Sequence, residues 1–116
     1  MTKQEREALA AVLEAIAAAK GEEPVVLDLT GLTTMTDYFV LAHGTNTRQV
    51  QSMAKRVEEN VRELCGLKPH HVEGLGPAQW VLMDYGFFIV HLFIEEKRGY
   101  YGLERIWMDA EHVKMS

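Results

Sequence analysis

Apolar residues recur with the period of an α-helix in two stretches of the chain. The first stretch follows Thr2 and Glu5, which have the spacing of a capping box, and it stops at Gly21. The second follows the polar residues around Asn46, which offer a helix cap, and it ends near Gly66. The positions expected to face the core are Leu9, Val12, Leu13, Ile16 and Ala17, and then Val50, Met53, Ala54, Val57, Val61 and Leu64. The pattern therefore predicts two amphipathic helices.

Shorter runs of apolar, β-branched and aromatic residues predict four strands. The predicted strands are Val25–Leu29, Asp37–Ala42, Gln79–Tyr85 and Phe87–Ile94. The run ending at Ala42 is almost continuously apolar, which is typical of a strand buried on both faces. The last two strands meet at Gly86 and form a hairpin. A polar turn is predicted at Glu95–Gly99, and a third helix over Tyr100–Ala110, with Tyr100, Leu103 and Trp107 at helical spacing.

The predicted elements follow the order α-β-β-α-β-β-α, which indicates an α/β fold. The helical crossover around Arg48–Leu64 would make one strand pair parallel, while the hairpin is antiparallel. A single mixed β-sheet covered by helices follows. The length of 116 residues fits one domain, so we predict a single domain over residues 1–116.

Composition narrows the class of partner. The formal net charge is −5, and no lysine- or arginine-rich block is present. Nucleic acid is therefore disfavoured as the main partner, and a basic protein fits better. The longest apolar runs are far shorter than the roughly 20 residues of a membrane helix, and the start of the chain is too polar for a secretory signal. These features predict a cytoplasmic protein that does not bind a membrane.

Candidate catalytic and metal-binding residues do not form a recognisable pattern. The five histidines lack the spacing of a zinc site, and Cys65 is the single cysteine. Gly44-Thr45 follows a strand and opens a helix, as in nucleotidyltransferases, but the paired carboxylates that would hold magnesium are missing between Gly44 and Ile94. Nothing in the spacing of Glu73 and Asp84 supports an acid/base pair. We therefore predict no catalytic site, no metal and no cofactor.

The hairpin at 79–93 is unusually rich in aromatic residues, with five in 15 positions. Along its first strand, Trp80, Leu82 and Asp84 share one face, and Tyr85 lies on the other. A carboxylate is costly to bury, so the Trp80 face should reach solvent near Asp84. By this reasoning Trp80 is either a hot-spot residue of a binding surface or a core residue. For His91 the alternatives are a buried, hydrogen-bonded histidine and a partner contact.

Several strings, taken together, resemble the ribosomal silencing factor S (Iojap-like) family from about Leu9 to Trp107. They are Asp37-Tyr38-Phe39-Val40, Gly44-Thr45-Asn46-Thr47-Arg48-Gln49-Val50, Glu73-Gly74, Trp80-Val81-Leu82-Met83-Asp84-Tyr85-Gly86, Val90-His91-Leu92-Phe93 and Arg98-Gly99-Tyr100-Tyr101-Gly102-Leu103-Glu104-Arg105-Ile106-Trp107. The resemblance implies a nucleotidyltransferase-like fold without catalytic carboxylates. It also implies docking on the large ribosomal subunit through that subunit's protein fourteen, which is basic, and a homodimer when free.

The residues that match the family's docking surface are Trp80, Asp84, Tyr85, His91 and Phe93. Docking there would block subunit association and repress translation, which makes a steric, non-enzymatic factor the leading hypothesis. The alternatives are a large-subunit assembly factor and a nucleotidyltransferase-related enzyme that binds nucleotides. The chain departs from the family pattern at Phe87, where an acidic residue is usual, and at His43, where a small residue is common.

Overall fold

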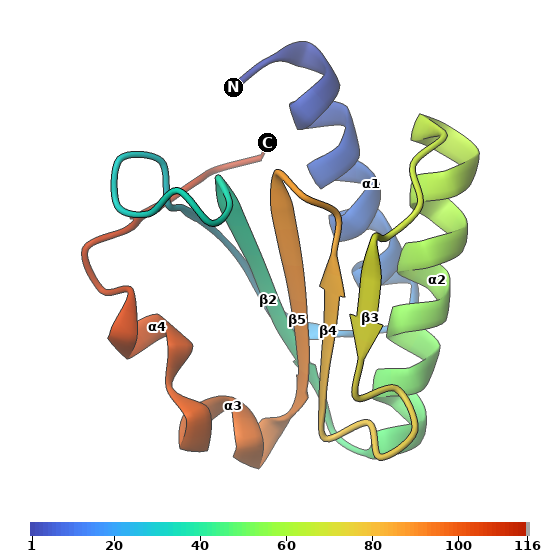
Figure 1. Ribbon diagram of the computed structural model, residues 1–116. Helices are drawn as coiled ribbons and strands as arrows, with labels where there is room; N and C mark the ends of the chain where they lie inside the picture. The colour runs from blue at the N-terminus through green and yellow to red at the C-terminus, as the bar shows by residue number, and fades with distance from the viewer. Residues whose placement is uncertain (116) are drawn as a thin grey trace.

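The computed structural model describes residues 1–115, and Ser116, the last residue of the predicted domain, lies outside them. The elements are α1 (Lys3–Ala18), β1 (Glu22–Asp28), β2 (Tyr38–Gly44), α2 (Thr47–Cys65), β3 (His71–Glu73), β4 (Trp80–Asp84), β5 (Phe88–Ile94), α3 (Glu95–Tyr101), α4 (Leu103–Ile106) and β6 (Glu111–His112). The strands form one six-stranded sheet in the order β3-β4-β5-β2-β1-β6. Helices α1 and α2 lie on one side of the sheet, and α3 and α4 lie at its opposite side (Figure 1). The predicted α/β class with a single mixed sheet is confirmed.

The two central strands, β2 and β5, run parallel, in a register that pairs Tyr38 with Phe88 and Gly44 with Ile94. Every residue of both strands is buried, which the apolar run ending at Ala42 predicted for β2. The other pairings are antiparallel, including the predicted hairpin of β4 and β5. Helix α2 makes the connection that lets the chain re-enter the sheet parallel to β2.

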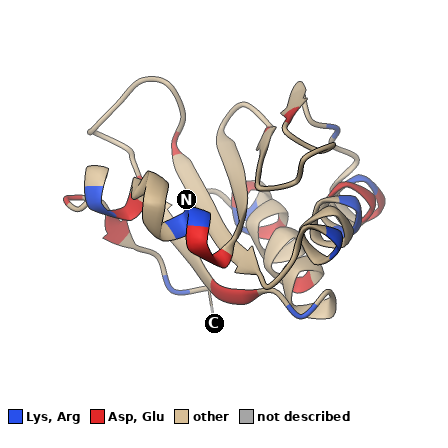
Figure 2. Ribbon diagram, turned by 90° about the horizontal axis from the view of Figure 1, so that it is seen from below, with Lys and Arg blue, Asp and Glu red and all other residues tan. Residues whose placement is uncertain are grey.

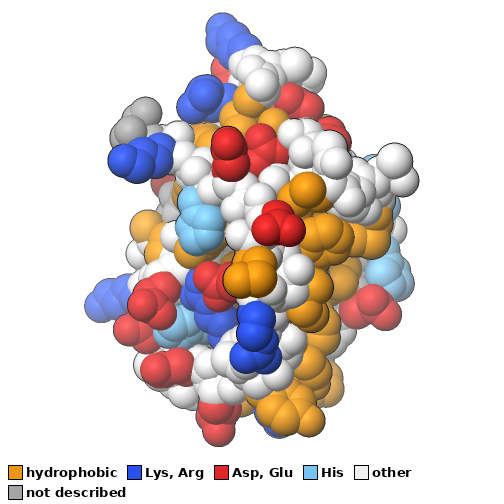
Figure 3. All heavy atoms as spheres, turned by 90° about the vertical axis from the view of Figure 1, so that its left-hand side faces the viewer, with side chains coloured by type: hydrophobic (Ala, Val, Ile, Leu, Met, Phe, Trp, Pro, Cys, Tyr) orange, Lys and Arg blue, Asp and Glu red, His pale blue; other side chains and the backbone are white. Residues whose placement is uncertain are grey.

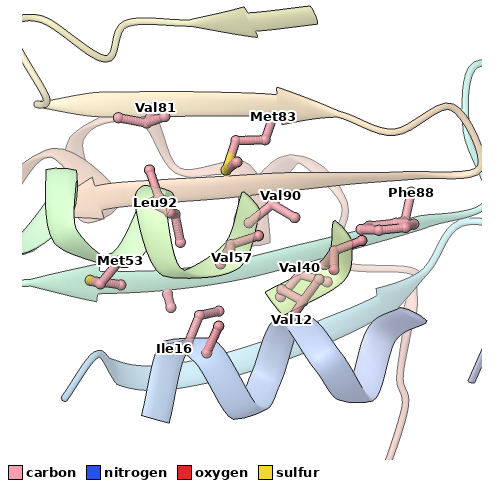
Figure 4. Close-up of a cluster of buried hydrophobic side chains, with 14 of the residues drawn as sticks. Val12, Ile16, Val40, Met53, Val57, Val81, Met83, Phe88, Val90 and Leu92 are labelled. Carbon is pink, nitrogen blue, oxygen red and sulfur yellow. The ribbon is translucent and has the colours of Figure 1, made fainter. Parts of the chain in front are cut away.

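The main core lies between the sheet and helices α1 and α2. Figure 4 shows side chains from both helices and from the central strands pointing toward one another. The labelled core residues are Val12, Ile16, Val40, Met53, Val57, Val81, Met83, Phe88, Val90 and Leu92. Many charged side chains lie on the helices (Figure 2), whereas the two central strands, β2 and β5, carry no Asp, Glu, Lys or Arg. On α1 and α2 the apolar side chains face the sheet, as the amphipathic pattern of the sequence predicted.

The ends of the two long helices are held by the predicted caps. In α1 the backbone N–H of Glu5 donates to the Thr2 hydroxyl at 3.1 Å, and the Thr2 N–H donates to the Glu5 carboxylate at 2.8 Å. In α2 the side-chain oxygen of Asn46 accepts from the N–H of Gln49 at 2.8 Å. Gly66 ends α2 in the left-handed region, at φ 69°, which glycine adopts at little cost.

The structure corrects four predictions. A helix, α3, occupies Glu95–Gly99 in place of the polar turn, because two acidic residues favour its first turn. Gly102 then ends α3 in the left-handed region, so the tail helix predicted over 100–110 is divided. Two short strands, β3 and β6, were missed because they carry few of the β-branched and aromatic residues that mark a strand. Two residues assigned to the core are exposed: Ala17 in α1, and Leu64 in the last turn of α2, which is 60% exposed.

Candidate functional site

Four of the five predicted site residues, Trp80, Asp84, His91 and Phe93, lie on the side of the sheet opposite α1 and α2. We call this surface the aromatic face and define it by Trp80, Leu82, Asp84, His91 and Phe93. In the antiparallel register Trp80 lies opposite Phe93, and Leu82 lies opposite His91. Neighbouring side chains of this kind lie on one face of a sheet and contact each other directly. The predicted sharing of a face by Trp80, Leu82 and Asp84 is confirmed.

Trp80 is half-buried, and its indole is held on three sides. The ring stacks on Phe93 at a centroid distance of 5.3 Å and contacts Tyr101 of α3 at 4.4 Å. Its Nε1–H donates a hydrogen bond to Nδ1 of His91 at 3.1 Å. The rest of the indole reaches solvent, so Trp80 is neither a free surface side chain nor a sealed core residue.

His91 is 3% exposed and neutral. Burial lowers the pKa of its imidazole to about 3, because the charged form would lose its hydration. Since Nδ1 accepts from Trp80, the neutral ring carries its proton on Nε2, which is buried and has no hydrogen-bond partner among residues 1–115. The buried, hydrogen-bonded alternative therefore describes His91.

Phe93 is fully buried beneath Trp80. Asp84 is half-buried at the end of β4, and one of its oxygens accepts from the N–H of Gly86 at 2.8 Å, which shapes the hairpin turn. Both residues therefore support the aromatic face, and only Asp84 also reaches its surface.

Tyr85 does not join this face. It is 5% exposed and stacks on Phe88 at 4.7 Å on the side covered by α1 and α2. Burial, together with the nearby carboxylate of Glu58, raises the pKa of Tyr85 to about 12. Its phenol oxygen has no hydrogen-bond partner within the described residues. The structure thus separates Tyr85 from the other four predicted site residues.

Sequence reasoning missed the contribution of α3 to the aromatic face. Tyr101 covers part of Trp80, while Leu103 and Trp107 belong to the apolar cluster beneath this side of the sheet. Because Glu95–Gly99 was interpreted as a turn, the tyrosines that follow were not placed beside the hairpin. The acidic pair at 95–96 before an aromatic pair was the available signal for a helix start.

The two departures from the family pattern lie away from the open part of this face. Phe87 is half-buried and packs edge-on against Phe88, on the side covered by the long helices. His43 is 4% exposed at the end of β2, and its Nδ1 lies 3.0 Å from the guanidinium of Arg98. Neither side chain therefore forms part of the surface around Trp80.

The Gly44-Thr45 turn is filled by the chain's own side chains. The carboxamide oxygen of Gln49 accepts from the Thr45 N–H at 2.8 Å, and Gln49 also donates to the carbonyl of Lys20 at 2.8 Å. A methyl group on Gly44 would lie only 2.9 Å from that same oxygen. The turn therefore acts as a cap for α2 that is tied to the end of α1. No helix in the described part of the chain combines the length and apolarity needed to cross a bilayer.

The fold defines a mixed α/β protein in which one sheet is covered by two long helices on one face and carries the aromatic face on the other. The family model described as "Ribosomal silencing factor during starvation" matches residues 2–116. The chain therefore belongs to the ribosomal silencing factor family.

Relatives agree with this placement. Ribosomal silencing factor RsfS of Bacillus subtilis is 37% identical over 91 residues, which are 78% of this chain and 76% of that protein. A crystal structure of a Chromobacterium violaceum protein superposes with a TM-score of 0.84 at 32% identity, covering 92% of this chain and 87% of the other. A mouse protein named "Mitochondrial assembly of ribosomal large subunit protein 1" is 35% identical over 74 residues, 62% of this chain and 32% of that protein.

Proposed function

We propose that the protein binds the large ribosomal subunit through that subunit's protein fourteen and sterically blocks association with the small subunit. Translation is repressed as a result. The protein acts by occupancy, without catalysis or a cofactor, in the cytoplasm, and it is a homodimer when free. The names of its bacterial relatives support a silencing role. The net charge of −5 supports a basic protein as the partner.

The observation that carries the proposal is that Trp80 on the aromatic face is only half-buried, so that part of its indole reaches solvent. The long helices cover the opposite face, and on this face Tyr101 of α3 covers part of the indole but leaves the rest in contact with solvent. In the proposed complex Trp80 contacts the partner directly, and Asp84 supplies a negative charge beside it. His91 and Phe93 hold the indole in place from beneath. Tyrosine and tryptophan side chains held in this way are typical hot-spot residues.

Replacing Trp80 with alanine tests the proposal. Loss of the indole should weaken binding to large subunits by about 2 kcal/mol or more, which is roughly thirtyfold. Co-sedimentation of the purified variant with large subunits measures the loss, and circular dichroism checks that the protein stays folded.

Leu64→Ala is the matched control, because Leu64 is 60% exposed on α2, away from the aromatic face. It should bind as the wild type does. Undiminished co-migration of Trp80→Ala would remove Trp80 as the anchor.

A second function is favoured by the name of the mouse relative, which refers to assembly of the large ribosomal subunit. An assembly factor would use the same docking surface on immature subunits and would not repress translation. The two functions differ in one assay. A silencing factor added to mature large and small subunits prevents their reassociation in sucrose gradients, whereas a pure assembly factor leaves reassociation unchanged.

A further inference from the structure

Exposed aromatic side chains continue from the aromatic face onto α3. The rings of Trp80 and Tyr101 are 4.4 Å apart, and those of Tyr101 and Tyr100 are 5.2 Å apart. Tyr101 is 39% exposed and Tyr100 is 74% exposed. We call these three residues the aromatic ridge. On this side of the molecule, hydrophobic side chains form a band that runs along one margin of the surface (Figure 3).

A buried arginine holds α3 in place beneath the ridge. Arg98 is 9% exposed, and its guanidinium donates to the backbone carbonyl of Glu23 at 2.8 Å. It also makes two parallel hydrogen bonds to the carboxylate of Glu104, at 2.9 and 3.2 Å. These bonds fix α3 to β1 and to α4, although α3 begins without a side-chain cap. Tyr100 is therefore exposed on a rigid support, which lowers the entropic cost of using it for binding.

Acidic side chains are concentrated at the start of α3, the helix that carries Tyr100. Three exposed carboxylates lie around His43 at the start of α3, from Glu22 and Glu23 of β1 and from Glu95 of α3, and Glu96 is the next residue of that helix. Glu22 and Glu95 approach the same imidazole, that of His43, with ligand atoms within 4.8 Å of one another.

The ring of Tyr100 already attracts a positive charge within the chain. The ammonium of Lys97 lies 5.1 Å from the ring centroid, in the range of a cation–π contact. Glu96 is four residues before Tyr100 and so projects from the same side of the helix. A strongly exposed aromatic ring with a carboxylate on the same side of its helix suits a planar guanidinium, which can stack on the ring and form an ion pair at once.

We propose that Tyr100 is a second contact point of the docking surface, at which an arginine side chain of the basic protein partner stacks on the phenol ring beside Glu96. This rests on the proposed function, because the arginine belongs to the ribosomal protein surface that Trp80 meets. The aromatic ridge then spans the interface from β4 to α3. Trp80 contacts the partner at the centre of the interface, and Tyr100 contacts the partner's arginine at the edge of the interface.

Titration of labelled protein with purified large subunits tests this contact. Tyr100→Ala should bind roughly three- to thirtyfold more weakly, while Tyr100→Phe should bind like the wild type because the ring face carries the contact. Glu96→Gln should bind several-fold more weakly, and the deficit should shrink as salt is raised. Met108→Ala is the control, because Met108 is also strongly exposed, at 76%, but lies beyond α4. It should bind normally.

The outcomes separate this contact from the proposed function. Wild-type affinity of Tyr100→Ala, together with weak binding of Trp80→Ala, would overturn the second contact and leave the proposed function standing. Tighter binding of Glu96→Gln would also overturn it, because a negative charge beside a stacked RNA base opposes binding whereas one beside an arginine favours it. If wild-type protein does not bind large subunits, the proposed function and the second contact both fail.

Discussion

The neutral, buried His91 makes the stability of the fold depend on pH in a way that a single substitution can isolate. Burial lowers the pKa of this imidazole to about 3, whereas an unfolded histidine titrates near 6.5. Between these values the unfolded chain binds a proton that the folded chain does not bind. The stability that the neutral His91 contributes is therefore fully present above the pKa of the unfolded imidazole, and it is lost progressively as the pH falls toward the pKa of the folded imidazole.

The size of the effect follows from the two pKa values. Each pH unit in this window is worth about 1.4 kcal/mol. From about pH 7 to about pH 5, protonation of the unfolded imidazole should remove about 2 kcal/mol of stability. His91→Gln has no titrating group and keeps an amide oxygen that can accept from the Trp80 indole. The wild type should therefore lose about 2 kcal/mol relative to this variant over the same interval.

Urea unfolding at several pH values, followed by circular dichroism, measures the difference. The free energies of wild type and variant should converge or cross as the pH falls, because only the wild type pays for keeping a neutral histidine. A curve for His91→Gln that runs parallel to that of the wild type would refute the assignment of a strongly lowered pKa.

Two further predictions concern stability. Arg98→Met should lower the free energy of unfolding by about 2–4 kcal/mol in urea titrations, because it removes the hydrogen bonds that hold α3 and leaves the Glu104 carboxylate unpaired. An unchanged unfolding midpoint would show that apolar contacts alone hold α3. Gly74→Ala should cost more than about 3 kcal/mol, because Gly74 has φ +81° and a Cβ would strike the carbonyl of Trp80. The matched Gly31→Ala, at φ +82° but in open space, should cost only about 1–2 kcal/mol, and equal losses in the two thermal melts would contradict the steric argument.

The sequence was most informative where one periodic pattern extended over many residues. Both long helices, the central strand β2 and the hairpin are confirmed, because each buries a regular set of apolar positions. The alternation along β4 also placed Trp80 and Tyr85 on opposite faces correctly. Periodicity predicts faces well, since a strand can change the face of a side chain only by changing register.

The alternation of apolar and polar residues does not show which elements cover each face of the sheet, because that depends on tertiary contacts. The position of Trp80 between core and surface depends on α3, which reaches back over the sheet and places Tyr101 against the indole. That helix is only seven residues long and is held by the tertiary bonds of Arg98, so its own sequence carries a weak signal. Short strands such as β3 and β6 escape prediction for the same reason, because their neighbours stabilise them.

The outermost strands, β3 and β6, have three and two residues, the shortest of the sheet. Edge strands this short present only a few unpaired backbone donors and acceptors, too few to pair stably with a strand of another molecule. Crowded copies of the chain thus have little means of stacking into a continuous ribbon. Recognition is left to side chains, which can discriminate among surfaces in a way that main-chain pairing cannot.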